Sequence, residues 1–384
     1  MVEELKKVFI EKFAATPILV KSPGRINLIG EHTDYNDGFV LPAAIDKYAY
    51  VAIQKREDKH INLFSVDFNE AQEATLPELT TEGKHWPVYI LGVVDQLLKS
   101  NYALTGFNLV LCGDVPIGAG LSSSAAVECA TIFALNELFN LGISKMEMVK
   151  MAQKAEHEFA GVKCGIMDQF ASMFGKENNL IRLDCRSLQY EYFPFYVPGF
   201  QVVLMDTHVK HSLASSAYNE RRAQCEKGVA IIQPFFPQVK SLRDVNLQML
   251  QQYVFPVDEL VYRRCKYVVE EIERTVNACT DLIKNDFISF GKKMFQTHEG
   301  LSNDYAVSCK ELDFLIQQVK DNPAVLGARM MGGGFGGCTI NLVKENEAEV
   351  LIEKVSKAYQ KETCSALSAY KVTIQDGVSV IDNK

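Results

Sequence analysis

The 384-residue chain lacks several features that mark particular classes of protein. It has no run of about 18 apolar residues, the length that a membrane helix needs, and it has no basic tract within a net charge of −8. We therefore expect neither a membrane nor a nucleic acid as a partner. Its ten cysteines form no CxxC pair, which argues against a structural zinc site, and so long a chain seldom depends on disulfides. We expect reduced thiols and a cytoplasmic location.

The length is more than a single hydrophobic core usually supports, about 250–300 residues, so two domains are expected. Runs that predict strands alternate with stretches of helical periodicity. Helices are expected near the N-terminus, around 144–159 and, in the second half, around 261–279, 287–297, 312–319 and 345–363. The apolar runs 17–20, 48–53, 107–112, 200–205 and 370–374 predict strands, and 62–83 predicts edge strands and a loop.

The segment Cys112–Ala126, CGDVPIGAGLSSSAA, places a glycine-rich loop before a predicted helix. Glycine lets the backbone approach a ligand closely, and the N–H groups of a first helical turn have no partner within the helix. Such a loop favours a bound phosphate. A helix capped by serine is the simpler alternative, but three consecutive serines exceed what one cap requires. No lysine follows the glycines, so this is not a Walker A loop.

Two acidic residues follow this loop. Ser144 and Glu147 match a capping box at the start of the predicted helix, and Glu156 then lies at the edge of its buried face. A carboxylate there needs a cation, either Arg, Lys or a metal ion. Asp168 follows Gly165 near a second helix start, where an acidic residue is often only a favourable charge.

Two further segments are rich in polar residues or glycine. The stretch Lys21–Gly38 is dense in charged side chains, yet its isoleucines and leucine suggest that it is partly buried, where charged groups need partners. Five glycines between 332 and 337 precede a predicted strand. His208 and His211 are three residues apart but have no evident third ligand, so we do not expect a metal site there.

Together these motifs resemble the GHMP kinases, and within them the galactokinase family. PIGAGLSSSAA resembles the central motif of the family, GRINLIGEHTDYNDG its N-terminal signature and GGGFGGCTI its third motif. CGIMDQF and VKHSLASSAYNERR are similar to further galactokinase segments. The resemblance implies an α+β fold of two domains, 1–195 and 196–384, with mixed sheets packed with helices. The first would recognise the sugar and the ATP phosphates, the second would be the C-terminal kinase domain, and the active site would lie in the cleft between them.

The resemblance also implies roles for individual residues. Asp168 would be the catalytic base, with Arg25 beside it. The sugar would be bound by Glu31, His32, Asp34, Gly165, Asp168 and Tyr218. ATP would be bound by Gly118, Ala119, Gly120, Leu121, Ser122, Ser123 and Ser124, with Trp86 near the adenine, although core packing is the alternative role for Trp86. Magnesium would be held by Ser124 and Glu156.

The activity that the resemblance implies is ATP- and Mg²⁺-dependent phosphorylation of galactose at its anomeric hydroxyl. Two alternatives remain open: a kinase for N-acetylgalactosamine, and a galactose- and ATP-sensing relative without turnover. Such sensors lack a Ser-Ala pair in the serine run, so Ser124 and Ala125 favour an active kinase. We expect a monomer or a weakly associating protein.

Overall fold

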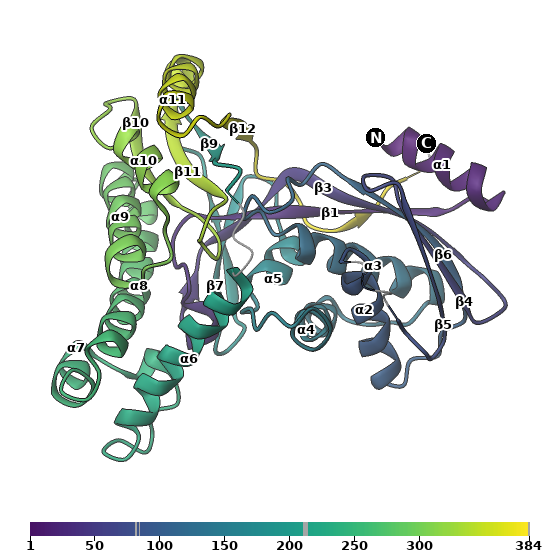
Figure 1. The fold of residues 1–384 in the computed structure, drawn as a ribbon, viewed down its shortest axis with the longest axis horizontal. Helices are drawn as coiled ribbons and strands as arrows, with labels where there is room; N and C mark the ends of the chain where they lie inside the picture. Colours follow the sequence, from purple (N-terminus) through teal and green to yellow (C-terminus); the bar gives the residue numbers. More distant parts are fainter. Residues whose placement is uncertain (81–82, 84, 210–213, 383–384) are drawn as a thin grey trace.

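In the computed structural model, the described residues are 1–80, 83, 85–209 and 214–382. They form sheets packed with helices, as the α+β expectation requires (Figure 1). Of the sheets that these residues form, only the six-stranded sheet is mixed, and the two smaller sheets are antiparallel. Within these residues, no helix is both long enough and apolar enough to span a bilayer. All ten cysteines are described and free.

The first half of the chain is built on a six-stranded sheet in the order β13-β1-β3-β6-β4-β5. Its strands are β1 (Ile18–Asn27), β3 (Pro42–Lys55), β4 (His60–Ser65), β5 (Glu70–Thr75), β6 (Phe107–Gly113) and β13 (Ser379–Val380). Neighbouring strands are antiparallel except β4 and β6, which are parallel. Because β13 comes from the end of the chain, the C-terminal segment returns to this sheet (Figure 1).

Helices cover both faces of this sheet. The helix α1 (Val2–Phe13) packs on one face through Leu5 and Phe9. The other face carries α2 (Pro87–Lys99), α3 (Ser123–Phe139), α4 (Lys145–Ala155) and α5 (Met167–Phe174). The predicted capping box of Ser144 and Glu147 starts α4. The helix then widens into a π-helical turn, η2 (Glu156–Ala160), and ends at Gly161 in the left-handed conformation.

The second half is organised around a four-stranded antiparallel sheet in the order β10-β11-β9-β12. Its strands are β9 (Phe200–Asp206), β10 (Val325–Met330), β11 (Cys338–Lys344) and β12 (Ser368–Val372). The helices of this half are α6 (Ala214–Ile232), α7 (Leu247–Met249), α8 (Glu259–Ile283), α9 (Phe287–Glu299), α10 (Lys310–Val319) and α11 (Ala348–Thr363). A smaller sheet pairs β2 (Phe39–Val40), β7 (Asn179–Asp184) and β8 (Tyr190–Pro194). The predicted boundary at residue 195 falls between β8 and β9 and stays a prediction.

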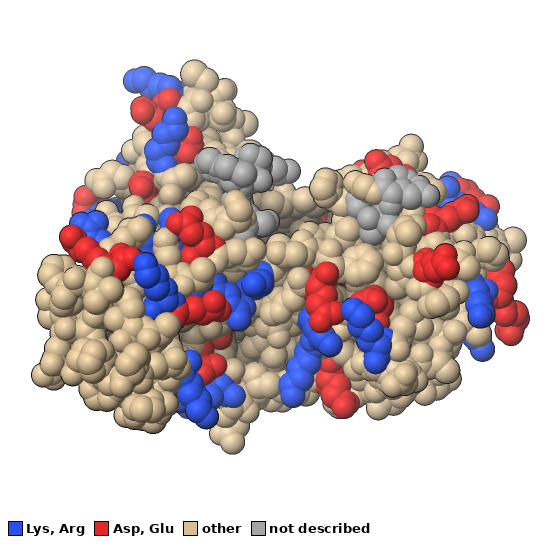
Figure 2. All heavy atoms as spheres, turned by 60° about the horizontal axis from the view of Figure 1, so that its bottom comes forward, with Lys and Arg blue, Asp and Glu red and all other residues tan. Residues whose placement is uncertain are grey.

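One apolar core joins the two halves. Ile26 and Leu28 belong to the same buried cluster as Leu204 of β9 and Ile340 of β11. The space-filling view is hollowed between the two halves, and on that face positive and negative side chains are interspersed (Figure 2). The shared core fixes the two halves against each other, so side chains from both can form one site.

The polar segment at Lys21–Gly38 corrects one expectation. We expected the strand before it to end at Val20, but β1 continues to Asn27. A bulge between Pro23 and Arg25 absorbs the two turn-forming residues. Gly24 is required there because a Cβ at this position would lie 2.8 Å from the backbone oxygen of Leu121. Arg25 is therefore presented by a strand of the central sheet rather than by a mobile loop.

Candidate active site

The loop between β6 and α3 is shaped by left-handed backbone. Gly118 and Gly120 have φ of 79° and 75°, and Ser122 has φ of 57°. A Cβ at Gly120 would lie 3.0 Å from the backbone oxygen of Met331, which precedes the second glycine-rich segment. The two glycine-rich segments, far apart in the sequence, therefore meet backbone to backbone.

The serines of this loop do not act as an ordinary helix cap. Ser122 occupies the N-cap position of α3, yet among the described residues its side chain accepts no capping hydrogen bond. Its hydroxyl instead donates to Oδ2 of Asp168. The hydroxyl of Ser124 donates to Oε1 of Glu156 at 3.1 Å. The alternative of a simple serine cap is thus wrong, and the serine side chains connect the loop to both predicted acidic residues.

Asp168, in the first turn of α5, is fixed by Arg25. The guanidinium donates from Nε to Oδ1 and from Nη2 to Oδ2, both at 2.8 Å, and from Nη1 to the backbone oxygen of Gly120 at 2.6 Å. Burial opposes the charge of Arg25, but Asp168 and Glu31 outweigh it and the arginine pKa is raised. The Arg25 side chain is 4% exposed and that of Asp168 24%, so the carboxylate is held rigidly while part of it stays accessible.

Beside Asp168 lies a polar cavity of about 170 Å³. All the residues predicted to bind the sugar or to act on it line this cavity, namely Arg25, Glu31, His32, Asp34, Gly165, Asp168 and Tyr218. Glu156 and the glycines at 332 and 333 line it too. The cavity thus brings together side chains and loops from both halves of the chain.

Glu31 is held by an arginine that sequence analysis missed. Nη2 of Arg329 in β10 donates to Oε2 of Glu31 at 2.6 Å, and Asn27 donates to the same oxygen at 3.0 Å. Arg329 is fully buried and also donates to the backbone oxygens of Leu28 and Met330. Nothing local in the sequence marks Arg329, because only the tertiary fold brings it to Glu31.

His32 is presented as a neutral ring. Its backbone is left-handed, with φ of 62°. Nδ1 lies 2.7 Å from the hydroxyl of Tyr35, which lies 2.7 Å from the hydroxyl of Tyr305. Burial lowers the pKa of His32 to about 3. Within the described residues its buried Nε2 has no hydrogen-bond partner, so this nitrogen is available to a ligand in the cavity.

Asp34 and Gly165 are in close contact. A Cβ at position 165 would lie 1.7 Å from Oδ2 of Asp34, so only glycine leaves room for this carboxylate. Burial, followed by the charge of Asp168, raises the pKa of Asp34 to about 7. The ring of Tyr218 lies 5.3 Å from that of His32 and packs over Gly333.

Glu156 lies at the start of the π-helical turn η2 and is buried. Its hydrogen bonds come from neutral groups: Ser124 to Oε1, and Cys164 (3.4 Å) and Gln169 (2.7 Å) to Oε2. Burial, followed by the charge of Asp168, raises the pKa of Glu156 to about 7. A carboxylate and a hydroxyl are oxygen ligands of the kind that Mg²⁺ takes, so Glu156 and Ser124 fit the predicted metal site.

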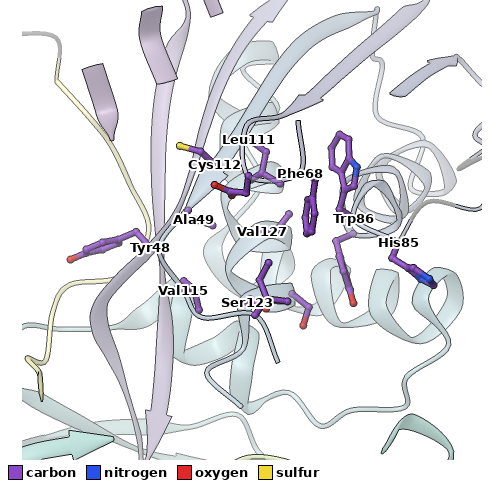
Figure 3. Close-up of a pocket in the computed structure, with 15 residues that line it drawn as sticks. Tyr48, Ala49, Phe68, His85, Trp86, Leu111, Cys112, Val115, Ser123 and Val127 are labelled. Carbon is purple, nitrogen blue, oxygen red and sulfur yellow. The ribbon is translucent and has the colours of Figure 1, made fainter. Parts of the chain in front are cut away.

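A second, mainly apolar cavity of about 350 Å³ opens beside the serine loop. Trp86 and Phe68 lie on one side of it and Ser123 at one end (Figure 3). Trp86 is only 6% exposed, and its indole nitrogen donates to Glu70 at 3.0 Å. Trp86 therefore packs in the core, which was the alternative role considered for it, and it also lines the cavity. Phe68, 46% exposed, was missed because it lies in the loop between β4 and β5. Of the edge strands expected in 62–83, only β5 lies at the edge of the sheet, since β4 pairs with both β5 and β6.

One predicted segment is only partly described. Residues 210–213, including His211, lie outside the described residues, so the histidine pair cannot be placed. The following residues form α6, which presents Tyr218 to the cavity.

Comparison with known proteins identifies the family. Three family models match: the galactokinase galactose-binding signature over residues 7–55, the GHMP kinase N-terminal domain over 88–176 and the GHMP kinase C-terminal domain over 278–361. The chain is 37% identical to a galactokinase of Roseiflexus sp. over 99% of this chain and 97% of that protein. It is 40% identical to a galactokinase of Thermotoga maritima over 94% and 99% of the two chains.

Solved structures agree with this result. The crystal structure of Lactococcus lactis galactokinase complexed with galactose superposes with a TM-score of 0.95 at 35% identity, covering 99% of this chain and 100% of that one. Methanococcus jannaschii mevalonate kinase, at 19% identity and a TM-score of 0.66 over 94% and 99% of the two chains, shares the fold. The chain belongs to the galactokinase family of GHMP kinases.

Proposed function

We propose that this protein transfers the γ-phosphoryl group of ATP to the anomeric hydroxyl of α-D-galactose, giving galactose 1-phosphate and ADP. The observation that carries the proposal is the position of Asp168. Its carboxylate is held by Arg25 on the wall of the polar cavity and contacts Ser122 of the phosphate-type loop. An acceptor for a proton therefore lies where a polar ligand and a phosphate would meet.

In the proposed step, the anomeric oxygen forms a bond to the γ-phosphorus while the bond from that phosphorus to the β–γ bridging oxygen breaks. Asp168 orients the anomeric hydroxyl and takes its proton, and ADP leaves. Phosphoryl transfer passes through a loose transition state, so positioning and charge stabilisation matter more than early activation of the nucleophile. Arg25 is suited to stabilising that charge because Asp168 and the backbone of Gly120 hold its guanidinium in place.

The polar cavity would bind the sugar. Carboxylates at Glu31 and Asp34, the free Nε2 of His32 and the phenol of Tyr218 offer acceptors and donors to a hydroxyl-rich ligand. The galactose complex of the Lactococcus lactis relative supports this assignment. A site of this kind discriminates strongly against an isomer that leaves its buried polar groups unpaired.

The glycine loop and α3 would bind the ATP phosphates, with the adenine in the apolar cavity beside Trp86 and Phe68 (Figure 3). Glu156 and Ser124 would hold Mg²⁺. When bound there, Mg²⁺ would supply positive charge that offsets the charge of the ATP phosphates. The hydrogen-bond partners of Glu156 are neutral, and the charge of Asp168 acts on it unfavourably. These surroundings support the assignment, because a buried carboxylate is stabilised by a cation.

The test is ADP release from ATP with galactose, N-acetylgalactosamine, glucose or mevalonate, each with and without Mg²⁺. We expect Mg²⁺-dependent release with galactose and little with glucose or mevalonate. Preference for N-acetylgalactosamine would change the substrate, and activity only on mevalonate would overturn the sugar assignment. Galactose-dependent ATP binding without ADP release would contradict the proposed catalysis.

A further inference from the structure

A buried glutamine connects the two acidic centres of the site. Gln169 follows Asp168 in α5 and is fully buried. Its Nε2 donates to Oε2 of Glu156 at 2.7 Å and to Oε2 of Glu128 at 3.0 Å. If the amide of Gln169 were flipped, its oxygen would face two carboxyl oxygens. Its NH₂ group therefore faces the two carboxyl groups.

Glu128, in α3, has no role in the proposed reaction so far. It is fully buried, it does not line the polar cavity, and within the described part of the chain its Oε1 has no hydrogen-bond partner. The hydrogen bond from Gln169 goes to its other carboxyl oxygen. A buried carboxyl oxygen without a hydrogen-bond partner costs free energy, which indicates that Glu128 serves its neighbour rather than the stability of the core.

The geometry gives Glu156 a support on each side. Ser124 donates to one of its carboxyl oxygens and Gln169 to the other. Together they fix the orientation of the carboxylate relative to the loop. Asp168, the proposed proton acceptor, lies beside Gln169 in α5. A shift of the Gln169 side chain would therefore move Glu156, the proposed cation ligand, relative to Asp168.

We propose that Gln169 is a positioning residue that orients Glu156 for the divalent cation, and that Glu128 is the buried acceptor that keeps the Gln169 amide turned toward Glu156. This inference rests on the proposed function, because it takes Glu156 to be a cation ligand. Glu128 acts as a hydrogen-bond acceptor in this arrangement, so its charge is not required.

The chain offers a matched control in Gln96 of α2. This glutamine is 2% exposed, and its Nε2 donates to Oε2 of Glu158 at 2.9 Å. As in the Gln169–Glu156 pair, a buried glutamine donates to a glutamate, but Glu158 is 38% exposed, is paired with Lys99 and does not line the polar cavity. Gln96→Met therefore measures the cost of losing a buried glutamine that donates to a carboxylate outside the site.

The experiment measures the apparent dissociation constant of Mg²⁺ from the rise in unfolding temperature that Mg²⁺ adds at saturating ADP. Loss of a side chain that orients a metal ligand weakens metal binding by about 10- to 100-fold. We expect Gln169→Met to raise the constant by that amount while galactose alone still raises the unfolding temperature. We expect Gln96→Met to leave the constant unchanged. An unchanged constant in Gln169→Met would overturn the inference.

Variants at Glu128 test the second half of the inference and guard against misfolding of Gln169→Met. The carbonyl of Glu128→Gln can still accept from Gln169, so this variant should keep the wild-type constant, whereas Glu128→Leu should raise it. Equal effects of the two variants would contradict the acceptor role. Glu156→Gln tests the underlying assignment separately: if it leaves the Mg²⁺ constant unchanged, the proposed cation site itself is wrong.

Discussion

The buried position of Asp34 disfavours the ionised form of its carboxyl group. The side chain lies against Gly165 beside Asp168, and its pKa is raised to about 7 by burial first and by the charge of Asp168 second. Burial favours a neutral Asp34, while an ionised one is the stronger acceptor for a sugar hydroxyl. Binding and stability therefore make opposite demands on this residue.

The conflict predicts a pH-dependent effect of Asp34→Asn on stability. The pKa of Asp34 rises on folding from its ordinary value of 3.8 to about 7, so the folded state holds the proton more tightly. The resulting stability is present at low pH and is lost as the pH rises toward 7 and above. In the absence of ligands, the unfolding temperature of Asp34→Asn relative to wild type should therefore increase between pH 5 and pH 8. A difference that stays constant or decreases would refute the raised pKa.

Individual site residues differ in how far the sequence could predict them. Asp168, Glu156 and the serines are marked locally, by the glycine before a helix, the edge of an apolar stripe and the excess of hydroxyls. Arg329 carries no such mark, because its contact with Glu31 spans 298 positions of sequence. The contacts of Glu156 with Cys164 and Gln169 were also missed, whereas Ser124 was paired with Glu156 in the predicted magnesium site.

At the scale of elements, periodicity predicted most of the helices but missed α2. It misplaced the ends of β1 and β3 and missed β10. The helices predicted around 144–159, 261–279 and 312–319 and the capping box depend on local spacing and are confirmed. Val276, which we expected on the buried face of α8, is 38% exposed. The extension of β1 depends on a bulge that tertiary contacts stabilise. In the sequence, Pro23 and Gly24 predict a turn at this place instead of a continued strand. Likewise, the sequence around Glu156 predicts an ordinary helix and gives no sign of the widened turn η2.

The turn into α5 gives a prediction at this scale. In Gly165→Ala, the new methyl group would overlap the carboxylate of Asp34 and must displace it or the turn. We expect the galactose KM to rise about 10-fold or more, comparable to the loss of one hydrogen bond to a charged group. Steady-state kinetics at saturating ATP measures this directly.

Gly142→Ala is the control for this substitution. Gly142 has φ of 69° and open space around its Cβ position. Forcing a side chain into the left-handed region costs about 1 kcal/mol or more, so this variant should lose stability but keep the wild-type galactose KM. A similar rise in KM in both variants would show that the contact with Asp34 is not the cause.

For the whole molecule, the central feature is that the site is shared by both halves of the chain. Glu31 comes from the segment after β1, and the arginine that binds it comes from β10 in the other sheet. The apolar core crosses between the halves in the same region. The family resemblance predicted a site between two domains, but this ion pair emerges only from the fold.

This buried ion pair predicts a large effect on global stability. Arg329→Met leaves the carboxylate of Glu31 buried without its cation, and breaking such a pair costs about 3–5 kcal/mol. Urea unfolding should show this decrease in the free energy of unfolding. The exposed pair of Lys357 and Glu353 serves as the control, since Lys357→Met should change stability by no more than about 0.5 kcal/mol. Equal effects of the two substitutions would contradict the role assigned to Arg329.

The most direct test of the proposed mechanism compares two aspartates that are each held by an arginine. Arg243 binds both carboxyl oxygens of Asp184, at 2.5 and 3.1 Å, as Arg25 binds those of Asp168, and the side chains of the two aspartates are 21% and 24% exposed. Only Asp168 lines the polar cavity. The measurement is kcat for galactose phosphorylation in Asp168→Asn and in Asp184→Asn. We predict a loss of about 10²- to 10⁴-fold in the first, as expected for removal of a general base, and a kcat close to wild type in the second. Near-wild-type turnover in Asp168→Asn would contradict both the proton-accepting and the orienting role of Asp168.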